Sequence, residues 1–163
     1  MRAGPIGLFR DIYHVKKNAA IQAAVTHDTP LGILAAQASA LMVHYFRYRF
    51  GPKEKLAAFL EEHAPGQPWS EPWKGKVGHL GVMSGRAAVS AIIAVSRLSD
   101  LLHACITYTG DVDTVATIAL GSASWSEEIE KDLPKQLFEN LEHSPFGFKY
   151  LAQLDRQLGE LAL

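Results

Sequence analysis

Cysteine is almost absent from this sequence of 163 residues, in which Cys105 is the only one. A single thiol excludes an internal disulfide framework and is typical of a reducing compartment, so we expect a cytoplasmic location. Cys105 lies within the apolar segment 101–106, where we expect it to act as a small buried hydrophobic residue. The N-terminus lacks the apolar core of a signal peptide, and no apolar run approaches the roughly 18 residues that would cross a bilayer. We therefore expect no membrane partner.

An excess of charge of either sign is also missing. The sequence has 16 Lys and Arg against 17 Asp and Glu, which gives a formal net charge of −1. Because a nucleic-acid-binding protein would show a basic patch, we expect no nucleic-acid partner. There is no C-x-x-C or H-E-x-x-H spacing for zinc, no Walker-type phosphate loop and no G-x-S-x-G nucleophile turn.

Apolar residues recur at helical spacing over long windows, whereas alternating strand-like segments are hard to find. The sequence therefore predicts an all-α fold in a single domain, residues 1–163. Thr29 is expected to cap a central alanine-rich helix that begins at Pro30, and Ser99 with Asp100 to cap another. The predicted helices cover residues 11–26, 30–49, 53–62, 84–98, 99 to just before 110, the stretch after the 111–114 turn to about 123, 134–143, and 147 onwards.

The most informative stretch is Thr109-Gly110-Asp111-Val112-Asp113-Thr114, which precedes the apolar run 115–120. It places two carboxylates and a hydroxyl beside a glycine, at the start of a predicted helix. Carboxylate and hydroxyl oxygens at this spacing can converge on Mg²⁺ or Mn²⁺, which prefer oxygen ligands. A second interpretation is that Asp113 is only the N-cap of that helix, since Asp is common at helix starts.

His27 lies at the junction of two predicted helices, within Thr26-His27-Asp28-Thr29-Pro30. Backbone N–H groups at a helix start attract anions, so a histidine at this junction can hydrogen-bond a phosphate or a ribose. The alternative is a structural histidine that is satisfied by the local backbone. The other histidines carry no motif.

Three stretches together suggest a family. They are Met1-Arg2-Ala3-Gly4-Pro5-Ile6-Gly7, the Thr26-His27 pair before the Pro-started helix, and Gly110-Asp111-Val112-Asp113-Thr114. In this order they resemble the ADP-ribosylglycohydrolases, the family of dinitrogenase reductase-activating glycohydrolase. The resemblance covers nearly the whole chain and corresponds to the C-terminal part of the family's domain. It implies an all-α, orthogonal multi-helix bundle.

The resemblance also implies an activity, the hydrolysis of the bond between ADP-ribose and a protein side chain at a binuclear Mg²⁺ or Mn²⁺ centre. It assigns Asp111, Asp113 and Thr114 as metal ligands, and His27 and Gly110 to substrate binding. No catalytic residue is identifiable in this chain. The implied partner is an ADP-ribosylated protein or an ADP-ribose-like ligand.

Two further positions follow from the same resemblance. Arg2 is expected to brace the fold beside the substrate loop rather than to touch the substrate. Thr109 stands where the family commonly has a second glycine, a difference that would stiffen the turn or narrow the approach to the ribose.

The sequence departs from the family pattern in one major respect. In the family, further metal ligands in a Thr-Asp-Asp run and an acidic residue implicated in catalysis precede the stretch that matches Met1 to Pro5, and this sequence has no Asp-Asp pair. Three ligands fill only a few of the about a dozen positions around two octahedral ions. We therefore expect weak or absent metal binding by this chain alone, and an exposed apolar face on the alanine-rich helices that favours association.

Three functional hypotheses remain open at this point. In the first, the chain is the C-terminal part of a hydrolase whose metal centre is completed by an N-terminal half, a partner chain or a homo-oligomer. In the second, it is a non-catalytic remnant that serves as a binding or structural module, or one half of a two-chain enzyme. In the third, it is a generic helical scaffold whose aspartates only cap helices.

Overall fold

The computed structural model describes residues 1–142 and 144–161, and in this part of the chain it contains helices and no β-strand. The all-α prediction is therefore confirmed. In chain order the elements are η1 (Gly4–Leu8), α1 (Ile12–Ala24), α2 (Pro30–Arg47), η2 (Lys53–Lys55), α3 (Leu56–His63), α4 (Gly81–Ala94), α5 (Leu98–Thr107), α6 (Val112–Ala123), α7 (Gln136–Glu139) and α8 (Phe148–Leu161). None of these described helices combines the length and the apolar composition needed to cross a bilayer.

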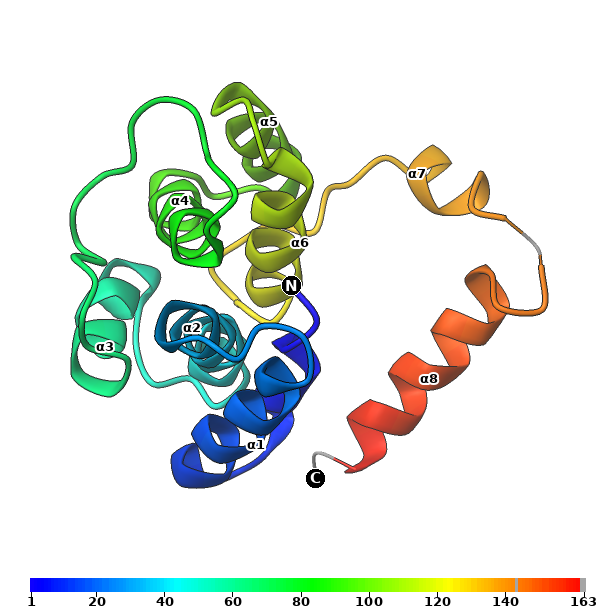
Figure 1. Cartoon of the computed structure of the whole chain (residues 1–163). Coiled ribbons are helices and arrows are strands. Elements are labelled where there is room, and N and C mark those ends of the chain that lie inside the picture. The colour runs from blue at the N-terminus through cyan, green and yellow to red at the C-terminus, as the bar shows by residue number, and fades with distance from the viewer. Residues whose placement is uncertain (143, 162–163) are drawn as a thin grey trace.

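Helix α2 lies at the centre of the packing, where it contacts α1, η1, α3, α4 and α6 (Figure 1). Over residues 30–40 its buried hydrophobic side chains are small, namely Ala35, Ala38 and Ala40. Small side chains allow helices to approach closely: a Cβ added to Gly81, the first residue of α4, would lie 2.9 Å from the Cβ of Ala35. The alanine-rich sequence of α2 thus sets the close crossing of α2 and α4.

The predicted start of α2 is confirmed. Pro30 is its first residue, and the Thr29 hydroxyl accepts a hydrogen bond from the Gly32 N–H at 3.1 Å. This satisfies one of the backbone donors that the first turn of a helix leaves without a partner.

The predicted cap of α5 is wrong, because the capping side chain comes from a distant part of the sequence. Helix α5 begins at Leu98, and Asp132 accepts hydrogen bonds from the Ser99 N–H at 2.9 Å and from the Ser99 hydroxyl at 2.5 Å. Together with the Arg97 guanidinium, 2.7 Å away, these donors hold the pKa of Asp132 below its ordinary value. A pattern search along one helix cannot find a cap that lies 33 residues further along the chain.

The predicted helix over 134–143 is largely absent: only the single turn α7, Gln136–Glu139, forms, and His143 lies outside the described residues. Helices this short depend on tertiary packing for their stability. Here that packing is missing, since Leu137 and Phe138 are 49% and 45% exposed.

Cys105 is fully buried within the core, as predicted. Burial raises the pKa of its thiol to about 11, so the reactive thiolate is scarce at neutral pH.

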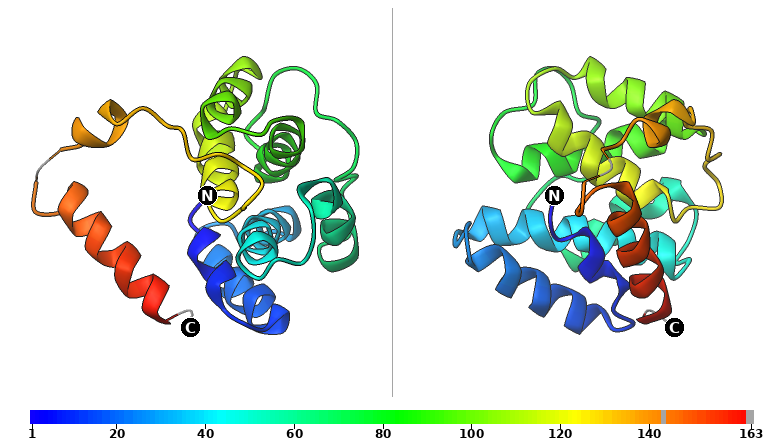
Figure 2. Two further views of the ribbon diagram at one scale, coloured as in Figure 1. Left: turned by 180° about the vertical axis from the view of Figure 1, so that it is seen from behind. Right: turned by 90° about the vertical axis from the view of Figure 1, so that its right-hand side faces the viewer.

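Helix α8 lies apart from the other helices and follows a long connection that contains α7 (Figures 1 and 2). Several of its apolar side chains remain exposed, among them Leu151 at 53% and Phe148 at 38%. Near its C-terminal end, Leu158 lines a mainly apolar cavity together with Pro5 and Leu8. Exposed apolar side chains therefore gather on the C-terminal arm, residues 136–142 and 144–161, whereas the sequence predicts the apolar face on the alanine-rich helices.

Candidate metal and ligand site

The turn that precedes α6 is held by the backbone of Val77. The Val77 N–H donates to the Thr109 carbonyl at 3.1 Å, and the Asp111 N–H donates to the Val77 carbonyl at 3.2 Å. Gly110 lies between these two bonds with a φ of +83°, and a Cβ at this position would stand 2.1 Å from the Val77 oxygen. Only glycine fits this position, so the fold accounts for the Gly110-Asp111 pair. Gly110 does not line the cavity described below, and its role in substrate binding stays a prediction.

Asp111 occupies the N-cap position of α6, but its carboxylate does not cap the helix. Instead Oδ1 accepts a hydrogen bond from the Thr114 hydroxyl at 2.8 Å, and Oδ2 accepts one from the Ser84 hydroxyl at 3.2 Å. A carboxylate has about four lone-pair directions, so each oxygen keeps acceptor capacity for a ligand. Asp113 lies in the first turn of the helix, and the interpretation of Asp113 as the N-cap is therefore wrong.

Ser84 is a residue that sequence reasoning missed. It is fully buried on α4 and reaches the Asp111 carboxylate, 27 residues further along the chain. A serine inside a helix commonly bonds the carbonyl four residues earlier. No local signal distinguishes Ser84 from such a serine, and the contact arises only because α4 packs against α6.

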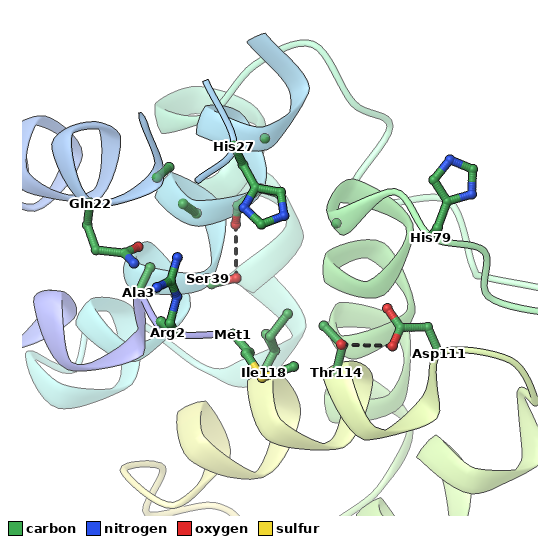
Figure 3. A pocket seen from close by; sticks show the side chains of 15 residues that line it. Met1, Arg2, Ala3, Gln22, His27, Ser39, His79, Asp111, Thr114 and Ile118 are labelled. Atoms are coloured by element: carbon green, nitrogen blue, oxygen red, sulfur yellow. Dashed lines mark hydrogen bonds between the residues drawn. The ribbon is translucent and has the colours of Figure 1, made fainter. Parts of the chain in front are cut away.

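A cavity of about 220 Å³ brings three of the predicted residues together: His27, Asp111 and Thr114 all line it (Figure 3). Asp113 is exposed and is not among the lining residues, and its assignment as a metal ligand stays a prediction. Gln22 and His79 also line the cavity, although neither belongs to a recognisable motif.

The loop that carries His27 packs tightly on the first turn of α2. A Cβ at Gly32 would lie 2.7 Å from the His27 carbonyl oxygen, so the glycine permits this close approach. Arg2 donates from Nη2 to the Thr26 hydroxyl oxygen at 2.5 Å, and the same oxygen lies 2.8 Å from His27 Nδ1. Arg2 thus braces the loop as expected, and it also lines the cavity.

The residues around Asp111 match Mg²⁺ or Mn²⁺ in the type of donor but not in the number of donors. One carboxylate and two hydroxyls, from Asp111, Thr114 and Ser84, are hard oxygen donors of the kind these ions prefer. Within residues 1–142 and 144–161, however, no three or more His, Cys, Asp or Glu side chains come close enough together to hold a metal ion. A metal ion at this place would therefore need donors beyond those that the described residues supply.

The geometry is that of an all-α protein in which an acidic, hydroxyl-rich turn and a histidine loop share one cavity. The ADP-ribosylglycohydrolase family model matches residues 1–162, and the chain belongs to that family. Family membership supports, at the level of the family, a hydrolase of ADP-ribose conjugates. No curated protein and no solved structure matches the chain.

The backbone geometry of the turn leads to a testable prediction about the stability of the protein. Thr109 adopts a φ of +59°, which is unfavourable for a β-branched residue, whereas glycine adopts it readily. Thr109→Gly should raise the free energy of unfolding by up to about 1 kcal/mol, since relief of the left-handed strain exceeds the entropic cost of glycine. Urea unfolding followed by circular dichroism measures this change.

The neighbouring glycine provides the matched control. Gly110→Ala should lower the free energy of unfolding by about 1–3 kcal/mol, because its Cβ would collide with the Val77 carbonyl. Wild-type stability in Gly110→Ala would contradict the described turn.

Proposed function

We propose that this chain supplies one wall of the site of a metal-dependent hydrolase that removes ADP-ribose from a modified protein side chain or a related ADP-ribosyl conjugate. The family match supports the reaction class. The observation that carries the proposal is the orientation of Asp111: its carboxylate makes no capping bond to the helix backbone, accepts hydrogen bonds from the Thr114 and Ser84 hydroxyls, and lines the cavity that His27 also lines.

The residues of this wall have distinct roles in the proposal. Asp111 is the principal metal ligand, Thr114 offers a hydroxyl oxygen to the same ion, and the hydroxyls of Thr114 and Ser84 fix the direction of the two Asp111 oxygens. Asp113 contributes from the exposed side of the same turn. A divalent cation held here would supply electrostatic stabilisation of developing negative charge and would favour deprotonation of water. Magnesium and manganese are both suited to this oxygen set.

The cavity is too small to enclose an ADP-ribose group. Its volume of about 220 Å³ lies below the about 300–1,000 Å³ of typical small-molecule sites. A further wall, from an N-terminal segment, a second copy or a different chain, would complete the pocket and add metal ligands. The isolated wall is accordingly expected to bind metal weakly.

A calorimetric titration with Mn²⁺ tests the metal assignment. Wild type should show weak binding, and Asp111→Asn should abolish it because the ligand inside the cavity loses its charge. Asp113→Asn is the matched control on the same turn and should lower the affinity less, since Asp113 is exposed and lies outside the cavity lining. Equal titration heats for wild type and both variants would refute the metal assignment.

Release of ADP-ribose from a modified protein tests the reaction. With Mg²⁺ or Mn²⁺ present, the chain should release ADP-ribose slowly at high protein concentration, and both EDTA and Asp111→Asn should stop the release. Measurements on arginine- and serine-linked conjugates would identify the acceptor side chain. No release at high concentration from either conjugate would count against a hydrolase formed by this chain alone.

A second candidate function is a non-catalytic binding or structural module, or one half of a two-chain enzyme. The exposed apolar face of α8 favours it, because Phe148, Leu151 and Leu154 are 38%, 53% and 36% exposed. Apolar side chains gathered on one helix commonly mark a surface that another chain covers. In this hypothesis the C-terminal arm binds another chain. That chain either completes the metal site of a two-chain enzyme or is the partner of a non-catalytic module.

Light scattering coupled to size-exclusion chromatography tests this association. The isolated chain should associate in a concentration-dependent way, and Leu151→Glu should weaken association by about 10- to 100-fold because a buried leucine is lost from the interface. Gln153→Glu adds the same charge at an exposed polar position of the same helix and should have little effect. A monomer at every concentration would exclude self-association through α8.

A further inference from the structure

We propose that Thr26, braced by Arg2, holds His27 in the Nε2–H tautomer, so that His27 presents a hydrogen-bond donor to a ligand oxygen in the cavity. Thr26 and Arg2 are positioning residues in this proposal, since they act on the ligand through the imidazole. The tautomer follows from hydrogen bonds within the chain. The identity of the ligand, an ADP-ribose phosphate or ribose oxygen, rests on the proposed function.

The first step concerns Arg2. A guanidinium has only donors, so the contact of 2.5 Å between Arg2 Nη2 and Thr26 Oγ1 has one possible direction, from Arg2 to Thr26. One lone pair of the Thr26 hydroxyl oxygen is thereby occupied. A charged donor also polarises the hydroxyl and makes its proton a better donor to the next group in the chain.

The second step concerns the Thr26 hydroxyl proton. His27 Nδ1 lies 2.8 Å from Thr26 Oγ1 and is the acceptor that the described residues offer to this proton. If Nδ1 were protonated instead, Thr26 Oγ1 would accept from both Arg2 and His27, and its own proton would have no protein acceptor among the described residues. Either direction keeps one hydrogen bond between Thr26 and His27, but the charged Arg2 donor makes Oγ1 a weaker second acceptor and its hydroxyl a stronger donor, which favours an unprotonated Nδ1.

The third step concerns the other ring nitrogen. In a neutral imidazole one nitrogen donates and the other accepts, so an accepting Nδ1 leaves the proton on Nε2. The structure shows no protein partner for Nε2 among the described residues, while His27 lines the cavity (Figure 3). Nε2–H is therefore the part of His27 that remains for a ligand.

The ligand chemistry follows from the groups on this side of the cavity. His27 offers a donor on a side of the cavity that the cationic Arg2 also lines, and a donor of this kind binds acceptor oxygens, most strongly those that carry negative charge. A ligand phosphate or hydroxyl oxygen therefore fits beside His27, whereas a ligand that presents only donors to Nε2 would be disfavoured.

Nitrogen NMR of the imidazole rings tests the tautomer directly. The ¹⁵N-labelled full chain is recorded at a pH high enough that the ring signals no longer change, so that only neutral rings contribute. The His27 signals are assigned by their disappearance in His27→Gln. Wild type should show one fixed tautomer with the proton on Nε2, and Thr26→Val should show the averaged pattern of a solvent-exposed ring such as His103.

Thr26→Ser is the matched control, because it keeps the hydroxyl and should keep the fixed Nε2–H pattern. A purely structural role of Thr26 would leave the ring pattern unchanged when the hydroxyl is removed. The proposal is overturned by a proton on Nδ1 in wild type, or by the wild-type pattern in Thr26→Val. The wild-type spectrum alone decides the tautomer if Thr26→Val does not fold.

Calorimetric titration with ADP-ribose tests the ligand part. Thr26→Val should bind ADP-ribose about 2- to 10-fold more weakly than wild type, and Thr26→Ser should bind it with wild-type affinity. Equal affinity of wild type and Thr26→Val would overturn the ligand part. No ADP-ribose binding by wild type would overturn the ligand part together with the proposed function, while the spectrum still decides the tautomer.

Discussion

The backbone contact between Gly110 and Val77 is the constraint on which the candidate site depends. Two hydrogen bonds join the segment before α4 to the turn before α6, and they fit only because Gly110 has no side chain. This contact sets the first turn of α6 beside α4, where Ser84 reaches the Asp111 carboxylate. Without it, Asp111 would be an ordinary residue at the start of a helix. The strain at Thr109, whose carbonyl accepts the first of these two bonds, is a local cost of the same arrangement.

The second requirement is the close packing of helices around α2. The loop with His27 and the turn with Asp111 are far apart in the sequence, and each is carried by a helix that contacts α2. Small residues let these segments approach α2 closely: Gly32 lets the His27 loop lie on α2, and Gly81 lets α4 approach Ala35. The cavity is the space that remains where these segments meet residues 1–3.

The parts of the fold and of the site that have a local cause could be predicted from the sequence. Helical periodicity identified the main helices, Thr29 with Pro30 identified the start of α2, and the apolar surroundings of Cys105 identified its burial. Ser84 and the cap formed by Asp132 could not be predicted, because each acts on a residue that only tertiary packing brings near. The segment after Pro134 shows the reverse case, in which a plausible helical pattern lacks the packing partner that would stabilise it.

The behaviour of Asp111 bears on whether the wall is functional or structural. An aspartate that caps a helix stabilises it by about 0.5–2 kcal/mol, and Asp111 stands at the capping position without making that bond. Its carboxylate bonds two hydroxyls instead and keeps acceptor capacity in the cavity. The bond to Ser84 satisfies a hydroxyl that is fully buried, so this orientation stabilises the fold by an amount comparable to the cap that it replaces. What distinguishes it from a cap is that the carboxylate lines the cavity that His27 also lines, where its remaining lone pairs are available to a ligand.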